Sequence, residues 1–220
     1  MSRRSSRNIV LSLAAAALGI AALIPAPSYA GGAAAGKPDQ AAAAAPAAPD
    51  AQQAMAAYAK LAAPGPQHQR LASLVGTWKV TGKGWMAPGQ PPAEMTGTNT
   101  ATAIMGGRYV QSVHSGSFMG QKFEGRETDG YDNVTHEYWS TWVDSMGTGV
   151  TVSRGTCDDP CKTLTETGDE VDPMTGKTQK NRIVTTFVDA DTYTMQMYLV
   201  GGAPDGGDFK MMELTAKRQK

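Results

Sequence analysis

The sequence predicts an all-β domain of about ten antiparallel strands that close into an up-and-down barrel, preceded by a short N-terminal helical segment. From Gly76 onward, short runs rich in Thr, Val, Tyr and Trp are separated by Gly, Asp, Asn and Pro at intervals of about 8–14 residues. No helix-length pattern interrupts this series, which argues against parallel crossovers. Ten strands with short connections must also hide their edges. Closure into a barrel does so, and a two-sheet sandwich is the alternative.

The first 30 residues have the pattern of a cleavable secretory signal peptide. Three arginines precede an apolar run, Ile9–Leu23, and small residues stand at the two positions that a signal peptidase reads, the second being Ala30. The apolar run is shorter than the ~20 residues that a membrane-spanning helix needs, so an uncleaved anchor is the weaker alternative. We therefore expect cleavage after Ala30 and a periplasmic or secreted location.

Composition divides the rest of the chain. A run made almost entirely of Ala, Pro and Gly predicts a disordered linker. Asp50 then suits the N-cap of a helix over Ala51–Ala63, and Pro64-Gly65-Pro66 ends that helix before a second helical turn over Gln67–Leu74. The predicted segments are a signal peptide over 1–30, a linker over 31–49, a helical segment over 50–75 and a β-barrel domain over 76–220.

Turn-forming residues bound the predicted strands. Gly106-Gly107, Met119-Gly120, Asp132-Asn133 and Met146-Gly147 all stand between apolar runs. The predicted strands are Thr77–Gly84, Glu94–Met105, Tyr109–Ser117, Lys122–Tyr131, Glu137–Asp144, Gly149–Cys157, Thr163–Gly168, Lys180–Val188, Thr192–Val200 and Phe209–Arg218.

Charge limits the classes of partner. Three of the 20 basic residues and none of the 20 acidic residues lie in the predicted signal peptide, so the mature chain carries a net charge of −3. Nucleic acids and anionic membranes both require a basic patch. The sequence therefore argues against nucleic-acid binding, and against stable membrane insertion once the signal peptide is removed.

Two cysteines, Cys157 and Cys161, are separated by Asp-Asp-Pro. An exported chain meets an oxidising compartment, where such a pair closes. The pair is a poor zinc site because it supplies two ligands where four are needed. We expect a disulfide that staples a local turn.

No signature of a known catalytic class is present. The chain lacks Gly-x-Ser-x-Gly, a P-loop, His-Glu-x-x-His and Cys-x-x-Cys. Its three histidines, His68, His114 and His136, lie on different segments without metal-ligand spacing. We therefore assign no catalytic residue, metal ion or cofactor.

Alternation along the strands selects a candidate lumen lining. If Trp142 points inward, the residues two positions away along its strand do so too. On the neighbouring strand, inward Glu127 and Asp129 would bury two carboxylates at a cost of several kcal/mol, so we expect Arg126 and Thr128 to face inward instead. With Val110 from the strand before, the predicted ligand-binding side chains are Ser112, His114, Arg126, Tyr138, Ser140, Trp142 and Asp144.

Other interpretations of the polar residues stay open. Glu127 and Asp129 share a strand face and can act as an acid/base pair, or they can form a solvated surface. His114 can line the lumen or pack structurally. Arg108 can bind an anion at the barrel mouth or cap a neighbouring carbonyl.

The segment Leu74-Val75-Gly76-Thr77-Trp78, directly after a helical turn, resembles the Gly-x-Trp opening of lipocalin-like, or calycin, barrels. In those barrels the Trp plugs one end and an Arg from the last strand packs over it. The resemblance assigns these structural roles to Trp78 and Arg218, which would interact by cation–π stacking.

A longer set of motifs, over about residues 50–218, resembles the bacterial family called domain of unknown function 1579 (DUF1579). This resemblance implies a lipocalin-like barrel and assigns no activity. The related nitrobindins hold haem through a His near their C-terminal end, but no histidine follows His136 here. The motifs are His68, Gly76-Thr77-Trp78, Gly106-Gly107-Arg108-Tyr109, Gly130-Tyr131-Asp132, Trp142-Val143-Asp144-Ser145 and Asp172-Pro173-Met174-Thr175-Gly176.

The functional hypothesis from the sequence is an exported lipocalin-like barrel that binds a small, mostly apolar molecule without catalysis. One alternative is a hydrolase- or isomerase-type enzyme with acid/base residues at the barrel mouth. Another is a structural envelope protein that docks through the helix Ala51–Ala63 and binds no ligand.

Overall fold

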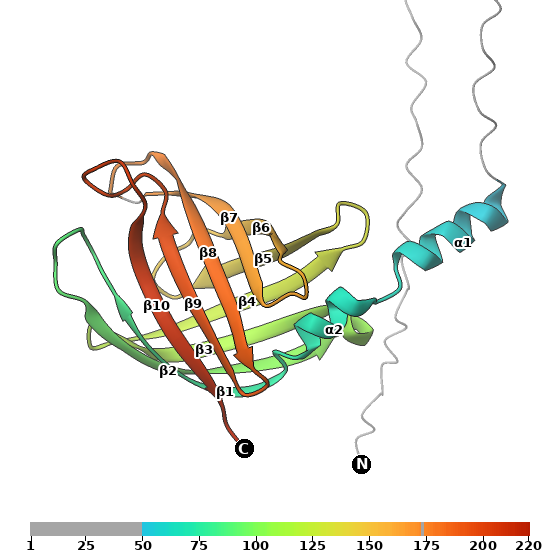
Figure 1. The fold of residues 1–220 in the computed structure, drawn as a ribbon, viewed down its shortest axis with the longest axis horizontal. Coiled ribbons are helices and arrows are strands. Elements are labelled where there is room, and N and C mark those ends of the chain that lie inside the picture. The colour runs from blue at the N-terminus through green and yellow to red at the C-terminus, as the bar shows by residue number, and fades with distance from the viewer. Residues whose placement is uncertain (1–49, 173) are drawn as a thin grey trace, which may run out of the picture. The chain divides into compact units, whose positions relative to one another are not determined.

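The computed structural model describes residues 50–172 and 174–220. The predicted signal peptide over 1–30, the predicted linker over 31–49 and Pro173 lie outside the described residues. The described chain forms two helices followed by a closed antiparallel barrel (Figure 1). The all-β fold and the ten-stranded up-and-down barrel predicted from the sequence are confirmed.

The helix α1 (Ala51–Leu61) begins where the sequence predicts. The Asp50 carboxylate accepts a hydrogen bond from the Gln53 amide at 2.8 Å, which satisfies one of the donors left free in the first turn. None of the residues of α1 is buried. The side-chain amide of Asn133, in a barrel turn, donates hydrogen bonds to the carbonyls of Leu61 and Ala63 and so holds the end of the helix.

The helix α2 (Pro66–Ala72) packs against the barrel. Proline is favoured at its first position because the missing amide donor would have no partner there. The helix buries His68 and Leu71, and the His68 Nδ1 atom accepts a hydrogen bond from the Gly65 amide at 3.0 Å. His68 therefore caps this helix, and burial lowers its pKa.

Each strand pairs with its neighbours in sequence, and the first pairs with the last, which closes the barrel. A 3₁₀ turn, η1 (Met105–Gly107), joins the second and third strands. The strands are β1 (Gly76–Gly84), β2 (Ala93–Ile104), β3 (Tyr109–Phe118), β4 (Gln121–Asp132), β5 (Glu137–Asp144), β6 (Thr151–Cys157), β7 (Thr163–Val171), β8 (Thr178–Asp189), β9 (Thr192–Leu199) and β10 (Phe209–Arg218).

Most of the predicted strand boundaries that differ do so by one or two residues: β6 begins at Thr151 and not at Gly149, and β8 begins at Thr178 and not at Lys180. Strand β7 continues to Val171, three residues past its predicted end at Gly168, because it pairs with β8 along its whole length. Met105 belongs to η1 and not to the strand before it; both Met105 and Gly106 have positive φ angles, which ordinary strand residues do not adopt.

The β3–β4 hairpin fixes the inward face of β4. Its two-residue turn, Met119-Gly120, has positive φ at both positions and places Phe118 opposite Gln121. Counting back from this pair puts Ser112 opposite Glu127. Directly opposed residues in an antiparallel pair point to the same side of the sheet, so Glu127 faces inward with Ser112.

One end of the barrel is closed by Trp78 and Arg218. Trp78 is 2% exposed, and its indole N–H donates to the Leu74 carbonyl at 2.7 Å. The guanidinium carbon of Arg218 lies 4.1 Å from the centre of the Trp78 ring. Arg218 also donates to the carbonyls of Ser73 and Val75, at 2.7 Å each. This pair therefore ties the chain after α2 to the last strand, as the resemblance implies.

A disulfide between Cys157 and Cys161 completes the same end. The predicted pairing is present, with the two Cα atoms 4.9 Å apart. Arg70 of α2 donates hydrogen bonds to the Cys161 carbonyl and lies 4.0 Å over the ring of Phe187. The disulfide loop is thus attached to α2. The buried apolar residues of this closed end are Leu71, Trp78, Ala101, Val110, Tyr138, Leu164, Phe187 and Ala216.

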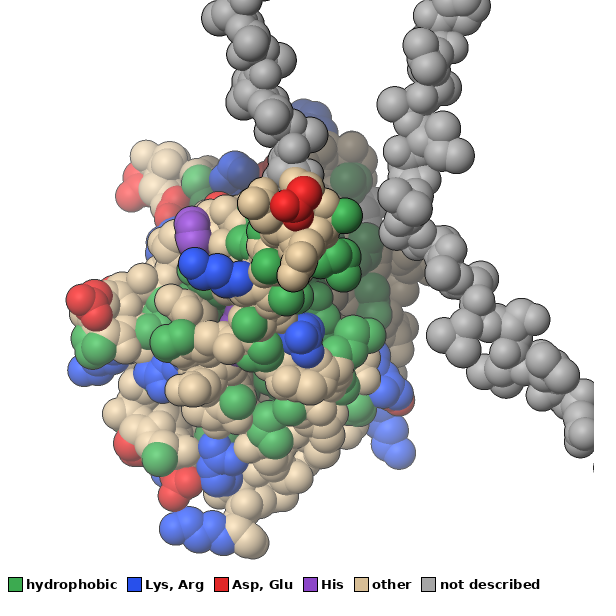
Figure 2. All heavy atoms as spheres, turned by 90° about the vertical axis from the view of Figure 1, so that its right-hand side faces the viewer, with side chains coloured by type: hydrophobic (Ala, Val, Ile, Leu, Met, Phe, Trp, Pro, Cys, Tyr) green, Lys and Arg blue, Asp and Glu red, His purple; other side chains and the backbone are tan. Residues whose placement is uncertain are grey.

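The outer surface mixes hydrophobic, polar and charged side chains. On the face seen in Figure 2, hydrophobic side chains are scattered among polar and basic ones. No helix within residues 50–172 and 174–220 has the length and apolar character needed to cross a membrane.

Candidate functional site

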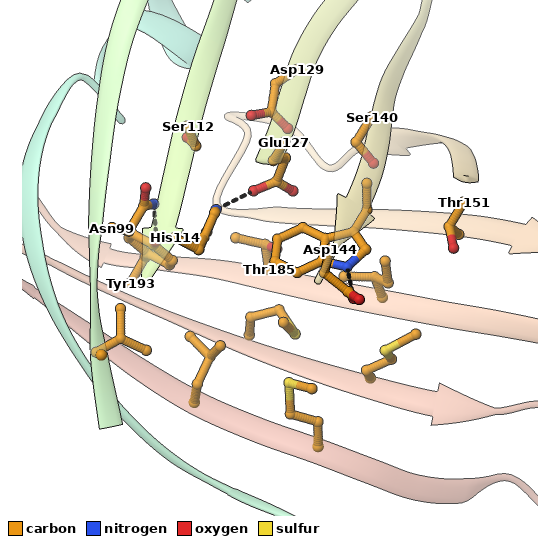
Figure 3. A pocket seen from close by; sticks show the side chains of 18 of the residues that line it. Asn99, Ser112, His114, Glu127, Asp129, Ser140, Asp144, Thr151, Thr185 and Tyr193 are labelled. Carbon is orange, nitrogen blue, oxygen red and sulfur yellow. Dashed lines mark hydrogen bonds and ion pairs between the residues drawn. The ribbon is translucent and has the colours of Figure 1, made fainter. Parts of the chain in front are cut away.

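A cavity of about 450 Å³ lies inside the barrel. Side chains from all ten strands and from α2 line it (Figure 3). On two strands, the residue that lies two positions beyond a closed-end core residue, on the same inward face, belongs to this lining. Ser112 follows Val110 on β3, and Glu166 follows Leu164 on β7. The closed-end core therefore forms the floor of the cavity.

The lining has two chemically different walls. Strands β8 to β10, with β1, supply most of the apolar wall, and strands β3 to β7 supply most of the polar wall; Figure 3 shows the sulfur-containing side chains opposite the labelled acidic ones. The apolar wall contains Val80, Ile183, Met195, Met197, Met212 and Leu214. The polar wall contains Ser112, His114, Glu127, Asp129, Ser140, Asp144, Ser153 and Glu166.

Trp142 is held against the wall by three contacts. Its indole N–H donates to the Asp144 carboxylate at 2.7 Å, and its ring meets His114 edge to face, with the centroids 5.0 Å apart. A Cβ atom on Gly125 would lie 2.3 Å from the Trp142 ring, so only glycine leaves room for the indole at that position. Trp142 is thus a fixed aromatic surface beside the cavity.

His114 and Glu127 form a polar pair within the lumen. The His114 Nε2 atom lies 3.1 Å from Glu127 Oε2, and both side chains are partly buried. The pairing follows from the hairpin register, because Glu127 faces Ser112 on the neighbouring strand and His114 is the next inward residue. The ring of Trp142 borders this pair.

Two further carboxyl groups lie close enough to the pair to interact electrostatically. Burial, followed by the charges of Glu127 and Glu166, raises the pKa of Asp129 well above its ordinary value. Burial also raises the pKa of Glu166 to about 7, with the charge of Glu127 as the second cause and a hydrogen bond with Ser140 opposing both. A carboxyl group with a pKa of about 7, such as Glu166, is partly protonated at neutral pH.

An uncharged pair of side chains, Asn99 and Tyr193, also lines the cavity. The Asn99 side-chain amide donates to the Tyr193 hydroxyl at 3.2 Å. Asn99 is 4% exposed, and its Oδ1 atom is buried without a hydrogen-bond partner among the described residues. Burial raises the pKa of Tyr193 to about 12, so this hydroxyl stays protonated. Tyr193 also contacts Trp78 edge to face, which links the site to the closed end.

The structure places five of the seven residues predicted to bind ligand on the cavity wall. They come from β3 and β5 and include the two polar residues, His114 and Asp144, whose side chains contact Trp142. Whether they bind a ligand stays a prediction. The five are Ser112, His114, Ser140, Trp142 and Asp144.

Two of the seven residues are placed elsewhere. The Arg126 side chain is 54% exposed and pairs with Glu124 on the outer surface, at 2.7 Å. Arg126 stands opposite Val113 and Val143, which also face outward, so the expected inward face of β4 was wrong and Thr128 is outward as well. The hairpin register determines which face of β4 points inward, even though this buries the carboxyl groups of Glu127 and Asp129. The raised pKa of Asp129 reduces the cost, because the protonated carboxyl carries no charge. Tyr138 points inward but is buried in the closed-end core and lies outside the cavity lining.

Three residues of the cavity wall were not predicted from the sequence: Glu166, Asn99 and Tyr193. A signal for Glu166 was available, because Leu164 is apolar and Glu166 is the next residue on its strand face. Asn99 and Tyr193 lie on strands β2 and β9, and strands β1 and β10 lie between these two around the barrel. That proximity depends on closure of the whole barrel.

Two other residues considered from the sequence, Arg108 and His136, do not line the cavity. Arg108 donates to the Met105 carbonyl at 3.1 Å and so stabilises η1. His136 is exposed in the β4–β5 turn with a positive φ angle. Within the described ranges, no three His, Cys, Asp or Glu side chains are arranged to hold a metal ion.

Comparisons with solved structures found similar folds at low sequence identity. A crystal structure, Rv2717c from M. tuberculosis, superimposes with a TM-score of 0.53 at 14% identity and covers 72% of this chain and 100% of its own. A redesigned β-barrel, b11L5F_LGL, has a TM-score of 0.34 at 16% identity and covers 68% of this chain and 95% of its own. EF1p2_mFAP2b bound to DFHBI has a TM-score of 0.36 at 13% identity, covering 69% and 99%. Of these three structures, the first has a TM-score above 0.5, and at 14% identity its likeness supports the fold and nothing more.

No curated protein matches the chain. The family described as protein of unknown function (DUF1579) matches residues 63–218, which include α2, the closed end and all ten strands of the barrel. This range covers well over half of the chain. The chain therefore belongs to the DUF1579 family.

Proposed function

We propose that this protein is an exported barrel that binds one small, mostly apolar molecule in its lumen. The observation that carries the proposal is the cavity of about 450 Å³ with an apolar wall on one side and convergent polar groups on the other. Small-molecule sites have volumes of roughly 300–1,000 Å³ and the same combination of an apolar lining with a few polar groups. Three methionines on the apolar wall suit a binding site because their side chains adapt to ligand shape.

A fluorescent reporter can test lumen binding directly. N-phenyl-1-naphthylamine is neutral and apolar, and its emission rises in an apolar site. We expect saturable binding with one site per chain. Thr185→Trp places a large ring on the lumen wall and should weaken binding at least tenfold. The matched control, Thr186→Trp, changes the next residue of β8, which faces outward, and should bind as the wild type does.

Failure of the folded wild-type protein to bind the reporter saturably would contradict the proposal. Equal binding by the wild type and Thr185→Trp would also contradict it, since the reporter would then lie outside the lumen. Far-ultraviolet circular dichroism of all three proteins establishes that each is folded.

Export is the second part of the proposal. The predicted signal peptide supports it, and the Cys157–Cys161 disulfide suits an oxidising compartment. Expression of the full chain with its own N-terminus, followed by N-terminal sequencing of the exported protein, should give Gly31 as the first residue. A chain that begins at Met1, or beyond Ala33, would contradict the cleavage prediction.

Acid/base catalysis is a second candidate function, and the lumen supplies one observation that favours it. Burial raises the pKa of Glu166 to about 7, where a carboxyl group can exchange protons at neutral pH, and the His114–Glu127 pair lines the same cavity. Turnover of 4-nitrophenyl acetate that drops at least tenfold in Glu166→Gln, and not in Asp169→Asn on the outer face of β7, would support this candidate. The absence of turnover, or turnover that survives Glu166→Gln, would count against it.

A further inference from the structure

The titratable lining of the cavity is acidic. Among the described residues, the lining includes five carboxyl groups, one histidine and one tyrosine, and no lysine or arginine. A ligand in the lumen would therefore meet hydrogen-bond acceptors and negative charge. The carboxyl groups are those of Glu127, Asp129, Asp144, Glu166 and Glu170.

Three of these carboxyl groups already have nitrogen partners. Glu127 faces His114, and Asp144 accepts from the Trp142 indole. Glu170 accepts from the side-chain amides of Gln179 and Asn181, at 3.0 Å and 3.4 Å.

The other two, Asp129 and Glu166, have no ion pair with a described residue, and the partner of Glu166 is the Ser140 hydroxyl. Burial is the main cause of both raised pKa values; the charges of Glu127 and Glu166 add to it at Asp129, and the charge of Glu127 adds to it at Glu166.

A buried acceptor elsewhere in the cavity lining also lacks a donor. The Asn99 Oδ1 atom has no hydrogen-bond partner among the described residues, although Asn99 is 4% exposed and its side chain lines the cavity (Figure 3). Buried acceptors are rarely left unpaired because the unmade hydrogen bond costs free energy. This atom is an observation independent of the carboxyl groups, and it also calls for a ligand that donates hydrogen bonds.

The acidic groups lie at the floor of the cavity. Asp129 stands opposite Val110 in the β3–β4 register, and Glu166 is the next inward residue after Leu164. Val110 and Leu164 both belong to the closed-end core. The apolar wall, by contrast, continues along β9 and β10 towards the end of the barrel away from α2, through Met197 and Met212.

We propose that the lumen takes an amphipathic amine, whose protonated amino group lies at the floor beside Asp129 and Glu166 and whose hydrocarbon body lies against the methionine wall. The inference rests on the proposed ligand-binding function and specifies its ligand class. A primary ammonium group supplies up to three N–H donors and one positive charge, and its charge would favour the ionised form of the two carboxyl groups that burial disfavours.

A matched series of displacing ligands tests the ligand class. Decylamine, decan-1-ol and decanoic acid share one hydrocarbon chain and differ in the charge of the head group. Each is titrated against bound N-phenyl-1-naphthylamine at pH 8, where the amine is cationic and the acid is anionic. We expect decylamine to displace the reporter at a concentration at least tenfold lower than decan-1-ol, with decanoate the weakest.

Four variants locate the preference. Asp129→Asn and Glu166→Gln keep the shape of each side chain and remove its charge, and each should reduce the preference for decylamine over decan-1-ol to less than threefold. The controls Glu124→Gln and Asp169→Asn remove one charge from the same strands on the outer surface, where the side chains are 57% and 61% exposed, and should keep the preference.

The results separate this inference from the proposed function. If the reporter does not bind the wild-type protein, the proposed function fails. If the reporter binds but the three ligands displace it equally, or decanoate does so best, the amine is the wrong ligand class while lumen binding stands. A preference for decylamine that survives in both lumen variants would also overturn the inference. The wild-type series decides the ligand class without relying on the folding of any variant.

Discussion

The guanidinium group of Arg218 lies 4.1 Å over the ring of Trp78 and also donates to the carbonyls of Ser73 and Val75. Arg218→Ala removes the cation–π contact and leaves the partly buried Val75 carbonyl and the exposed Ser73 carbonyl without this donor. We expect the free energy of unfolding to fall by about 3 kcal/mol, measured by urea denaturation. Lys217→Ala, at the exposed neighbouring position, should change it by less than about 0.5 kcal/mol. Equal effects of the two variants would show that Arg218 does not close the barrel end.

The Cys157–Cys161 disulfide closes a loop of five residues that is attached to α2 through Arg70. The entropy of closing so short a loop in the unfolded chain corresponds to about 2 kcal/mol of stability. We expect the double variant Cys157→Ser, Cys161→Ser to lose that amount, and dithiothreitol to lower the stability of the wild type and not of the double variant. Labelling of both thiols in non-reduced protein would contradict the prediction.

Glu166 makes stability depend on pH. Its pKa is about 7 in the folded protein and near the ordinary value of 4.5 in the unfolded chain, so the folded state binds more protons between these values. Stability should therefore fall as pH rises through this window. Glu166→Gln removes this contribution, and its stability relative to the wild type should increase by about 3 kcal/mol between pH 4.5 and pH 8.

The control for this pH dependence is Asp169→Asn, an exposed change on the same strand. Its difference from the wild type should stay nearly constant over the same range. Urea denaturation at a series of pH values measures both. A constant difference between Glu166→Gln and the wild type would show that Glu166 does not titrate abnormally.

Much of the fold could be predicted because its determinants are local. Glycine and asparagine turns mark the strand ends, and the Asp50 cap marks the start of α1. The predicted strand end at Met105 was wrong because Met105 has a positive φ angle, and methionine gives no sequence signal for that conformation.

The candidate site could be predicted only in part because it depends on which strand faces meet. The two-residue turn at Met119-Gly120 already determines that Glu127 faces Ser112, yet an argument from the cost of buried carboxyls favoured Arg126. That argument treated each carboxyl as charged, whereas burial raises the pKa of Asp129 and Glu166 and lets them hold protons. Asn99 and Tyr193 meet across the closing strands, and no local pattern reports that contact.

Native mass spectrometry of protein purified from its own compartment tests the central claim, that the lumen is a ligand site, most directly. Thr185 lines the cavity and Thr186 does not. We expect the wild type and Thr186→Trp each to carry one bound small molecule, and Thr185→Trp to have the mass of the bare polypeptide. A wild-type protein at its bare mass, or an identical adduct on Thr185→Trp, would contradict the claim.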